Sequence, residues 1–302
     1  MGSFVADLMG RGKAIPVPGE TVKGSYFKVG PGGKGGNQAV AAARAGGDVA
    51  MITKLGYDLF GDMAIESFKG EGIDTNHVFR SHEHPTGAAL ILVNEDTGQN
   101  SIMVIPGACG HLEADEVVAA MRALAPAGVL MLQLETNFEA VAASLKEGRA
   151  MGLKIICNPA PAHTIPAEYY PLIDFLTPNE TEAATLSGIE VVDLDSAEKA
   201  ARALRAMGAA NVLITLGEKG AMVLAAGEAT RLVPAFKVEA VDTTGAGDAF
   251  NGALALALAE GRDLVAATLF ANAAAALSVT KIGTAPAMPR RDEIDLFLAQ
   301  HK

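Results

Sequence analysis

Alternation between short apolar runs and amphipathic runs constrains the fold of this chain more than any other feature. Strand-like runs at residues 49–55, 128–134 and 154–157 alternate with helix-like runs at 60–69 and 138–150, and further strand-like runs follow at 173–176, 211–215 and 220–224. This order predicts an α/β fold in which helices cover both faces of a parallel sheet. The chain has 302 residues, half of them apolar, and we expect residues 1–302 to form one domain.

Two segments, residues 10–31 and 84–106, interrupt the alternation. Both contain short strand-like runs with turn signals, such as Pro18-Gly19 and the Asn-Glu-Asp-Thr-Gly sequence at 94–98, and neither contains a helix-like run. We predict that they form a small β-sheet that leaves the core and returns to it, as a lid over a ligand site does. The alternative is two separate surface hairpins.

Charge and composition exclude several classes of protein. The chain has 24 basic and 35 acidic residues, a net charge of −11, which argues against binding to nucleic acid or to an anionic membrane. It contains no uncharged apolar run of the ~18 residues that a membrane span needs, and its start does not resemble a signal peptide. Two cysteines, Cys109 and Cys157, are too few for a disulfide framework. We expect both to be reduced and the protein to be cytoplasmic.

A glycine-rich loop before a helix has the features of a catalytic site. Residues 242–252 read Asp-Thr-Thr-Gly-Ala-Gly-Asp-Ala-Phe-Asn-Gly and lead into an Ala/Leu-rich run. The backbone N–H groups of Gly245, Ala246 and Gly247 are open to an anion, and the partial positive charge of the helix N-terminus adds to their attraction. Asp248, in the same turn, is placed to take a proton from a hydroxyl. An anion site beside a base is what phosphoryl transfer to a hydroxyl requires.

A second glycine-rich run, Gly-Pro-Gly-Gly-Lys-Gly-Gly-Asn at residues 30–37, has several interpretations. It satisfies the dinucleotide pattern G-x-G-x-x-G, but the next strand-like run ends in Thr53 where that pattern needs an acidic residue. It is not a Walker loop, because Gly35 stands where Ser or Thr is required. A sugar site remains, in which glycines let the backbone approach a polyol and Asn37 offers a donor and an acceptor. A helix entrance without a ligand is the alternative.

Together these two runs resemble the paired signatures of the ribokinase, or phosphofructokinase-B, family of carbohydrate kinases, and they occur in that family's order. The resemblance spans nearly the whole chain. It implies a Rossmann-like three-layer α/β/α fold with a small β-sheet lid, which often pairs with a second subunit to form a homodimer. It also implies transfer of the γ-phosphoryl group of ATP, with Mg²⁺ and K⁺, to the primary hydroxyl of a pentose, with D-ribose as the first choice.

The same resemblance assigns sugar contacts residue by residue. They are Asp7, Gly33, Lys34, Gly35, Asn37, Glu135 and Asp248, and Asp248 is also the expected catalytic base. Asp7 should lie at the C-terminal end of the first strand and Glu135 after the strand-like run 128–134, which is the sheet edge where open α/β folds bind ligands. The alternative for Asp7 is a turn residue.

Nucleotide and cation contacts follow from the resemblance in the same way. The ATP contacts would be Asn179, Thr215, Gly217, Gly220, Gly247 and Asn272. Asn179 and Glu182 would organise Mg²⁺ through its waters, because this ion keeps several of them. Oxygen ligands for K⁺ would come from Asp242, Thr244, Ser278, Lys281, Gly283 and Ala287. The alternatives are structural: helix caps at Asn179 and Asp242, a hairpin turn at 215–220, and a polar face residue at Asn272.

Two departures from the family pattern bear on the substrate. Ribokinases carry Asn two positions before the residue matched by Asp7, where this chain has Val5. An apolar side chain cannot bond a ring hydroxyl, so 2-deoxyribose or another pentose stays an alternative. The chain also begins later than its relatives, so we expect either a misplaced start or a short first strand. A nucleoside or hexose kinase, or a sugar-binding regulator without turnover, are further alternatives, and Asp248 argues against the last.

Overall fold

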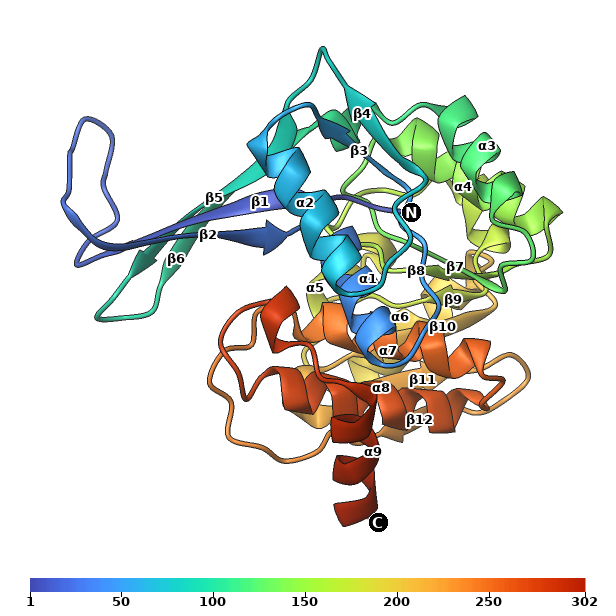
Figure 1. The fold of residues 1–302 in the computed structure, drawn as a ribbon. Helices are drawn as coiled ribbons and strands as arrows, with labels where there is room; N and C mark the ends of the chain where they lie inside the picture. Colours follow the sequence, from blue (N-terminus) through green and yellow to red (C-terminus); the bar gives the residue numbers. More distant parts are fainter. Residues whose placement is uncertain (302) are drawn as a thin grey trace.

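Four short parallel strands form the centre of the main β-sheet in a computed structural model that describes residues 1–301 (Figure 1). They lie side by side in chain order: β7 (Val129–Leu132), β8 (Lys154–Cys157), β9 (Phe175–Leu176) and β10 (Asn211–Thr215). Two further strands, β11 (Ala221–Leu224) and β12 (Arg231–Val233), extend the sheet. The predicted parallel sheet thus has an antiparallel edge, because the turn closed by the Leu216 N–H bond to the Gly220 C=O is too short for a helical crossover.

Consecutive residues of the central strands face opposite helical layers. In β8, Ile155 and Cys157 pack against the layer of α3 (Ala114–Ala123), α4 (Phe138–Ala150), α5 (Glu180–Ser187) and α6 (Leu194–Ala206). Ile156, between them, packs against the layer of α7 (Ala246–Ala259), α8 (Leu264–Ser278) and α9 (Arg291–Gln300). All three side chains are fully buried. The predicted three-layer α/β/α arrangement is therefore confirmed.

The two segments that interrupt the alternation pair into one four-stranded sheet, which we call the lid sheet. Its strands are β1 (Val5–Gly12), β2 (Gly24–Gly32), β5 (Thr86–Asn94) and β6 (Asn100–Gly107), in the order β2-β1-β5-β6. The antiparallel hairpins β1–β2 and β5–β6 are joined by the parallel pair β1–β5, so they are not two separate hairpins. Figure 1 shows this sheet projecting away from the helical layers.

A third cluster of buried side chains joins the root of the lid sheet to the main body. Phe4, just before β1, meets Phe68 edge to face with ring centroids 5.7 Å apart. This cluster lies among α1 (Lys34–Arg44), α2 (Leu59–Gly70) and the parallel pair β3 (Thr53–Gly56) and β4 (Val78–Ser81). Short 3-10 turns complete the described elements at Ala108–His111, Ala167–Leu172, Gly217–Lys219 and Ala285–Ala287.

Helices α1 and α7 pack with their backbones in contact, and this contact positions the site. A Cβ added to Gly252 in α7 would lie 2.5 Å from the Cβ of Ala41 and 2.6 Å from the carbonyl oxygen of Gln38. Only glycine permits an approach this close. As a result, the first turn of α7 faces the first turns of α1, and the two glycine-rich runs of the sequence meet.

Candidate active site

Asp248 lies in the first turn of α7 and is 6% exposed. The helix begins after Gly245, whose φ of 81° is in the left-handed region that favours glycine. The Asp248 carboxylate accepts one hydrogen bond from Asn37 Nδ2, at 3.0 Å, and one from Gln38 Nε2, at 2.9 Å. Both donors come from α1, so the backbone contact between α1 and α7 creates this arrangement.

Burial raises the pKa of Asp248 above its ordinary value. The positive charge of Lys34 and the hydrogen bonds from Gln38 and Asn37 oppose that rise, and the negative charge of Glu135 adds to it. A carboxylate with a raised pKa holds a proton more readily, which suits a group that accepts one during a reaction.

The backbone N–H groups around Gly245 differ from the predicted set of three. The N–H of Ala246 donates to the carbonyl of Thr243 at 3.3 Å, and the first helical bond runs from Ala249 to Gly245. The N–H groups of Gly245, Gly247 and Asp248 have no such partner among residues 1–301. The Ala246 N–H is thus engaged within the loop, and its role in holding an anion stays a prediction, whereas the N–H of Asp248 is an unpartnered donor that the sequence reasoning missed.

A polar cavity of about 160 Å³ opens in front of these donors. It brings together eight predicted residues: Lys34, Asn179, Glu182, Thr215, Gly245, Ala246, Gly247 and Asp248. It also contains five that the sequence reasoning missed: Asn158, Ala160, Thr177, Thr243 and Asn251. Asn158 and Thr177 directly follow β8 and β9. Polar residues at the carboxyl ends of parallel strands are candidate ligand contacts, so the sequence could have predicted these two.

Three carboxylates face one region on the side of the lid sheet. The pKa of Asp7 is raised to about 6, mainly by burial and also by the negative charges of Glu135 and Asp248, while Lys28 opposes the rise. Glu135 accepts a hydrogen bond from the N–H of Lys34 at 2.9 Å, and another from the Ser3 hydroxyl. Asp7 lies inside β1, not at the end of a main-sheet strand as predicted, because β1 belongs to the lid sheet.

Asn37 has one amide atom without a partner. Asn37 is 5% exposed. Its Nδ2 donates a hydrogen bond to Asp248, but its Oδ1 has no hydrogen-bond partner among residues 1–301. A buried oxygen left unpaired is costly, so a ligand hydroxyl that donates to it would remove this cost. Asn37 therefore offers a free acceptor beside Asp248 to a ligand group that donates a hydrogen bond.

The glycines of the 30–37 run serve the chain's own packing. A Cβ on Gly33 would lie 2.8 Å from the N of Val5, and one on Gly35 would lie 2.5 Å from the N of Ser3. A Cβ on Gly32 would overlap the Asp7 carboxylate. These close approaches place α1 directly against the segment before β1. Packing alone therefore explains why these positions are glycine, and no ligand is needed to explain it.

Asn179 and Glu182 form a capping box at the start of α5. Asn179 Oδ1 accepts from the N–H of Glu182 at 2.8 Å, and Glu182 Oε2 accepts from the N–H of Asn179 at 2.9 Å. Burial raises the pKa of Glu182, which is 7% exposed. The predicted structural alternative is present here, and the second carboxylate oxygen of Glu182 is free of this box.

The other predicted nucleotide contacts lie near the junction of β10, β11 and β12. Gly217 and Gly220 belong to the turn between β10 and β11, and a Cβ on Gly220 would overlap the carbonyl oxygen of Val233. Asn272 in α8 donates to the carbonyls of Val233 and Pro234, each at 3.0 Å, and does not line the polar cavity. Asn272 is thus engaged in anchoring the end of β12.

The predicted K⁺ residues lie in two segments that contact each other. Asp242 accepts hydrogen bonds from the N–H groups of Thr244, at 3.0 Å, and Gly283, at 2.9 Å. Burial alone would raise the pKa of Asp242, but these hydrogen bonds hold it below its ordinary value. Ser278 bonds within its own helix, Lys281 pairs with Glu293 at 2.7 Å, and the N–H of Ala287 donates to Thr284. In residues 1–301, no group of three or more His, Cys, Asp or Glu side chains is arranged to hold a metal ion.

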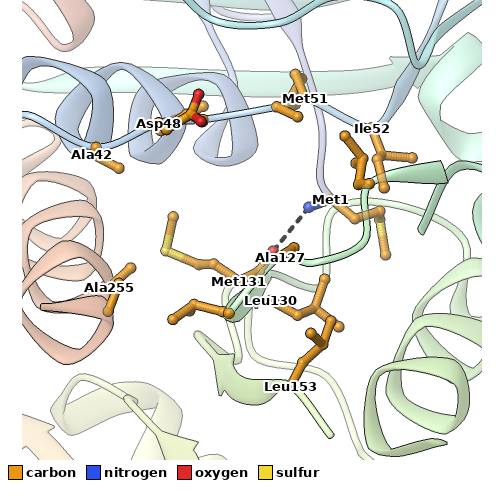
Figure 2. Close-up of a pocket in the computed structure, with 18 of the residues that line it drawn as sticks. Met1, Ala42, Asp48, Met51, Ile52, Ala127, Leu130, Met131, Leu153 and Ala255 are labelled. Atoms are coloured by element: carbon orange, nitrogen blue, oxygen red, sulfur yellow. Dashed lines mark hydrogen bonds between the residues drawn. The ribbon is translucent and has the colours of Figure 1, made fainter. Parts of the chain in front are cut away.

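A second cavity, of about 550 Å³, lies between β7 and the segment before β3 (Figure 2). Apolar side chains such as Met51, Leu130 and Leu153 line it, and the amine of Met1 donates to the carbonyl of Met131 at 2.9 Å. Of the predicted site residues only Gly35 lines this cavity, so it is not the candidate catalytic site.

Both cysteines, Cys109 and Cys157, are unpaired and buried, and burial raises the pKa of each thiol to about 12. No helix within residues 1–301 has the length and apolar character needed to cross a membrane.

Comparisons with known proteins show which proteins this chain resembles. The profile of the pfkB family of carbohydrate kinases matches residues 1–291. The chain is 42% identical over 298 residues to a ribokinase of Haemophilus influenzae, covering 99% of this chain and 97% of the relative. It is 39% identical over 300 residues to a deoxyribokinase of Salmonella typhi, covering 99% and 97%. A solved ribokinase of Arabidopsis thaliana, complexed with ribose and ATP, matches at a TM-score of 0.90 and 31% identity, covering 98% of this chain and 96% of that one.

Proposed function

The chain belongs to the pfkB family of carbohydrate kinases, and on that premise we propose that it transfers the γ-phosphoryl group of ATP to the primary hydroxyl of D-ribose. The observation that supports this most directly is Asp248, a buried carboxylate with unpartnered N–H groups in its own helical turn. The unpaired Oδ1 of Asn37 lies on the neighbouring helix turn, where a sugar hydroxyl can donate to it.

In the proposed reaction, Asp248 takes the proton of the acceptor hydroxyl, and the hydroxyl oxygen forms a bond to the γ-phosphorus. The bond between that phosphorus and the bridging oxygen of ATP breaks, and ADP leaves with the electron pair. The N–H groups of Gly245, Gly247 and Asp248 hold the phosphoryl oxygens as charge develops on them. The ammonium of Lys34, which lines the same cavity, neutralises part of that charge. Asp7 and Glu135 accept hydrogen bonds from the other sugar hydroxyls and orient the ring. Catalysis is then mostly a matter of positioning and electrostatics.

Two cations belong to this proposal. Mg²⁺, held through water by the free Glu182 oxygen and by Asn179, would neutralise the ATP phosphates when bound. The capping box uses Glu182 Oε2 and the single side-chain oxygen of Asn179, so Glu182 Oε1 is the oxygen left to accept a hydrogen bond from a Mg²⁺-bound water. K⁺ would bind beside Asp242 and Thr244, where backbone carbonyls and hydroxyls supply oxygen ligands. Turnover measured with and without each cation tests both sites.

An assay for ADP release over a panel of D-ribose, 2-deoxyribose and nucleosides tests the proposed reaction. Asp248→Asn keeps the shape of the side chain and removes the base, so we expect turnover to collapse while sugar affinity stays. Asp195→Asn is the matched control, since Asp195 is exposed in the first turn of α6 and far from these residues in the chain. Normal turnover in Asp248→Asn contradicts the proposed base.

2-Deoxyribose is a second candidate substrate, supported by Val5 and by the deoxyribokinase relative. Val5 is 4% exposed and lies two residues from Asp7 in β1, on the same face of the strand. Val5→Asn adds a donor, so we expect the ratio of kcat/KM for ribose to that for 2-deoxyribose to rise about tenfold. Val5→Ala, which adds no donor, is the control. An unchanged ratio in Val5→Asn contradicts a role for this position.

We also propose that two copies pair through the lid sheet. The strand registers place six apolar side chains on the sheet face opposite Asp7: Phe27, Val29, Leu90, Leu92, Met103 and Ile105. They are 39–67% exposed, and a patch of this kind on a small sheet favours a second copy of the same surface. Light scattering should show a dimer that Phe27→Lys with Met103→Lys dissociates. Tyr26→Lys, on the other face, should leave the dimer intact, and a monomeric parent chain contradicts the proposal.

A further inference from the structure

Gln38, next to Asn37 in α1, is fully buried and uses its whole amide group. Its Oε1 accepts from Gln133 Nε2 at 2.7 Å. Its Nε2 donates to Asp248 Oδ1 and to Asn158 Oδ1, each at 2.9 Å. Gln38 is 0% exposed, so its side chain reaches Asp248 from within the protein and is not open to substrate.

These bonds continue in a closed ring. Asn158 Nδ2 donates to the carbonyl of Thr177 at 3.0 Å, and the Thr177 hydroxyl donates to Asn251 Oδ1 at 2.6 Å. Asn251 Nδ2 then donates to the carbonyl of Gly247 at 2.8 Å, which returns the chain of bonds to the first turn of α7. We call this chain of bonds, from Gln38 and Asp248 through Asn158, Thr177 and Asn251 to Gly247, the amide ring. It ties the carboxyl edge of the main sheet to both α1 and α7.

The partners of Gln38 allow only one orientation of its amide. If the amide turned over, its oxygen would face the Asp248 carboxylate and its nitrogen would face the Gln133 donor, and both contacts would be repulsive. Gln133 and Asn158 therefore lock the donor side of Gln38 against Asp248. Each polar atom of the Gln38 amide has a partner in this orientation, although Gln133 Oε1 has none among residues 1–301, so turning the Gln38 amide over would lose its bonds at a high cost.

We propose that Gln38 is a positioning residue for phosphoryl transfer: its locked amide fixes the plane of the Asp248 carboxylate, so that a free lone pair faces the acceptor hydroxyl. Asn37 holds the other carboxylate oxygen, and together the two amides leave the carboxylate no freedom to rotate. The proposal rests on the role of Asp248 as base in the proposed function. It adds that this role depends on a residue that contacts neither sugar nor ATP.

The pH dependence of the reaction separates positioning from a merely structural role. The charged groups facing Asp248 are Lys34, Glu135, Glu182 and Asp7, and the donors from Gln38 and Asn37 favour its charged form. Removing the Gln38 donor raises the pKa of Asp248 further. Because the base acts in its deprotonated form, the acid limb of kcat should move to higher pH.

The test uses Gln38→Met, which keeps the length and removes the hydrogen bonds, with exposed Gln300→Met as the matched control. We expect kcat to fall about 10- to 100-fold, the value of a hydrogen bond to a charged group, and the acid limb to rise by about one pH unit. The sugar KM should stay at its parent value. Gln133→Met removes the hydrogen bond that holds the Gln38 amide in its orientation. It should lower kcat and raise the acid limb in the same way as Gln38→Met, but by smaller amounts.

A folded Gln38→Met with parent kcat and an unmoved acid limb overturns the proposal. If Gln38→Met does not fold, Gln133→Met decides: its parent-like pH profile overturns the proposal in the same way. Failure of the proposed function has a different signature, because Asp248→Asn would then retain turnover. If Asp248→Asn loses turnover while Gln38→Met and Gln133→Met both behave like the parent, the positioning role is refuted and the role of Asp248 as base stands.

Discussion

Substitution of Gly252 by alanine tests how closely the site depends on the contact between α1 and α7. The added Cβ would meet the Cβ of Ala41 at 2.5 Å, the carbonyl oxygen of Gln38 at 2.6 Å and the N of Ala42 at 2.8 Å, whereas ordinary contacts begin at 3.4 Å. Two of these three atoms are backbone, so no side-chain rotation relieves the overlap. The helices must separate by about 1 Å, a distance at which catalytic geometry is lost.

Two opposing terms set the size of the effect on stability. Alanine in a helix interior is about 1 kcal/mol more favourable than glycine, and overpacking costs about 1–3 kcal/mol. With backbone atoms in the way we take a cost of about 2–3 kcal/mol, which leaves a net loss of about 1–2 kcal/mol. At about 2 °C per kcal/mol for a chain of this size, Tm should fall by about 2–4 °C.

The effect on turnover should be much larger than the effect on stability. Asn37 and Gln38 both reach Asp248 across this helix contact, so a shift of about 1 Å lengthens both hydrogen bonds and should lower kcat about 100-fold. Gly70→Ala is the matched control, since Gly70 ends α2 and a Cβ there meets nothing within 4 Å. If Gly252→Ala shows parent kcat and a Tm no lower than that of Gly70→Ala, α1 and α7 do not position the site.

Three further predictions concern single residues. Gly247→Val adds a side chain where a Cβ meets nothing within 4 Å, so Tm should hold while kcat falls on the order of 10²–10³-fold, and an unaffected rate would place the phosphate elsewhere. Lys34→Met should raise the KM for ATP and lower kcat with little change in Tm. Steady-state kinetics with ATP varied measure both constants, and parent values for both would contradict a role for Lys34. Asp7→Asn removes a carboxyl whose pKa is raised from 3.8 to about 6, and whose charged form therefore destabilises the folded state. The Tm of Asp7→Asn should rise relative to the parent as pH increases through that interval, and a constant difference would contradict the raised pKa.

Local patterns were enough to predict the parts of the site that depend on one segment of chain. The loop before α7 and the first turn of this helix are such a part, because the glycines, the other small residues of the loop and the Ala/Leu-rich run are consecutive in the sequence. The family and the three-layer fold were predicted in the same way, and both are confirmed. The single-domain reading, the cytoplasmic location, K⁺ and Mg²⁺ binding and the lid-mediated dimer stay predictions.

Contacts made across the fold could not be predicted. Gln38 lies in a helix next to Asn37, and nothing in the sequence indicates that its amide meets Asn158, Gln133 and Asp248. The glycines of the 30–37 run were read as room for a sugar, whereas the close neighbours of Gly33 and Gly35 are backbone atoms of residues 2–5. In both cases the partner is distant in sequence or is set by packing, and a local pattern carries no information about it.

The charge of the site imposes an order on the proposed reaction. The negative charges of Glu135 and Asp248 add to the effect of burial in raising the pKa of Asp7, so these three carboxylates repel one another across the region proposed for the sugar, and the whole chain carries a net charge of −11. A triphosphate is therefore attracted only where Lys34 and free N–H groups face the cavity, and the carboxylates oppose its entry into the sugar region. A neutral polyol meets no such opposition, since its hydroxyls donate to the same carboxylates. In the proposed arrangement the carboxylates thus favour the neutral sugar, Lys34 and the free N–H groups favour the triphosphate, and the two ligands meet at Asp248.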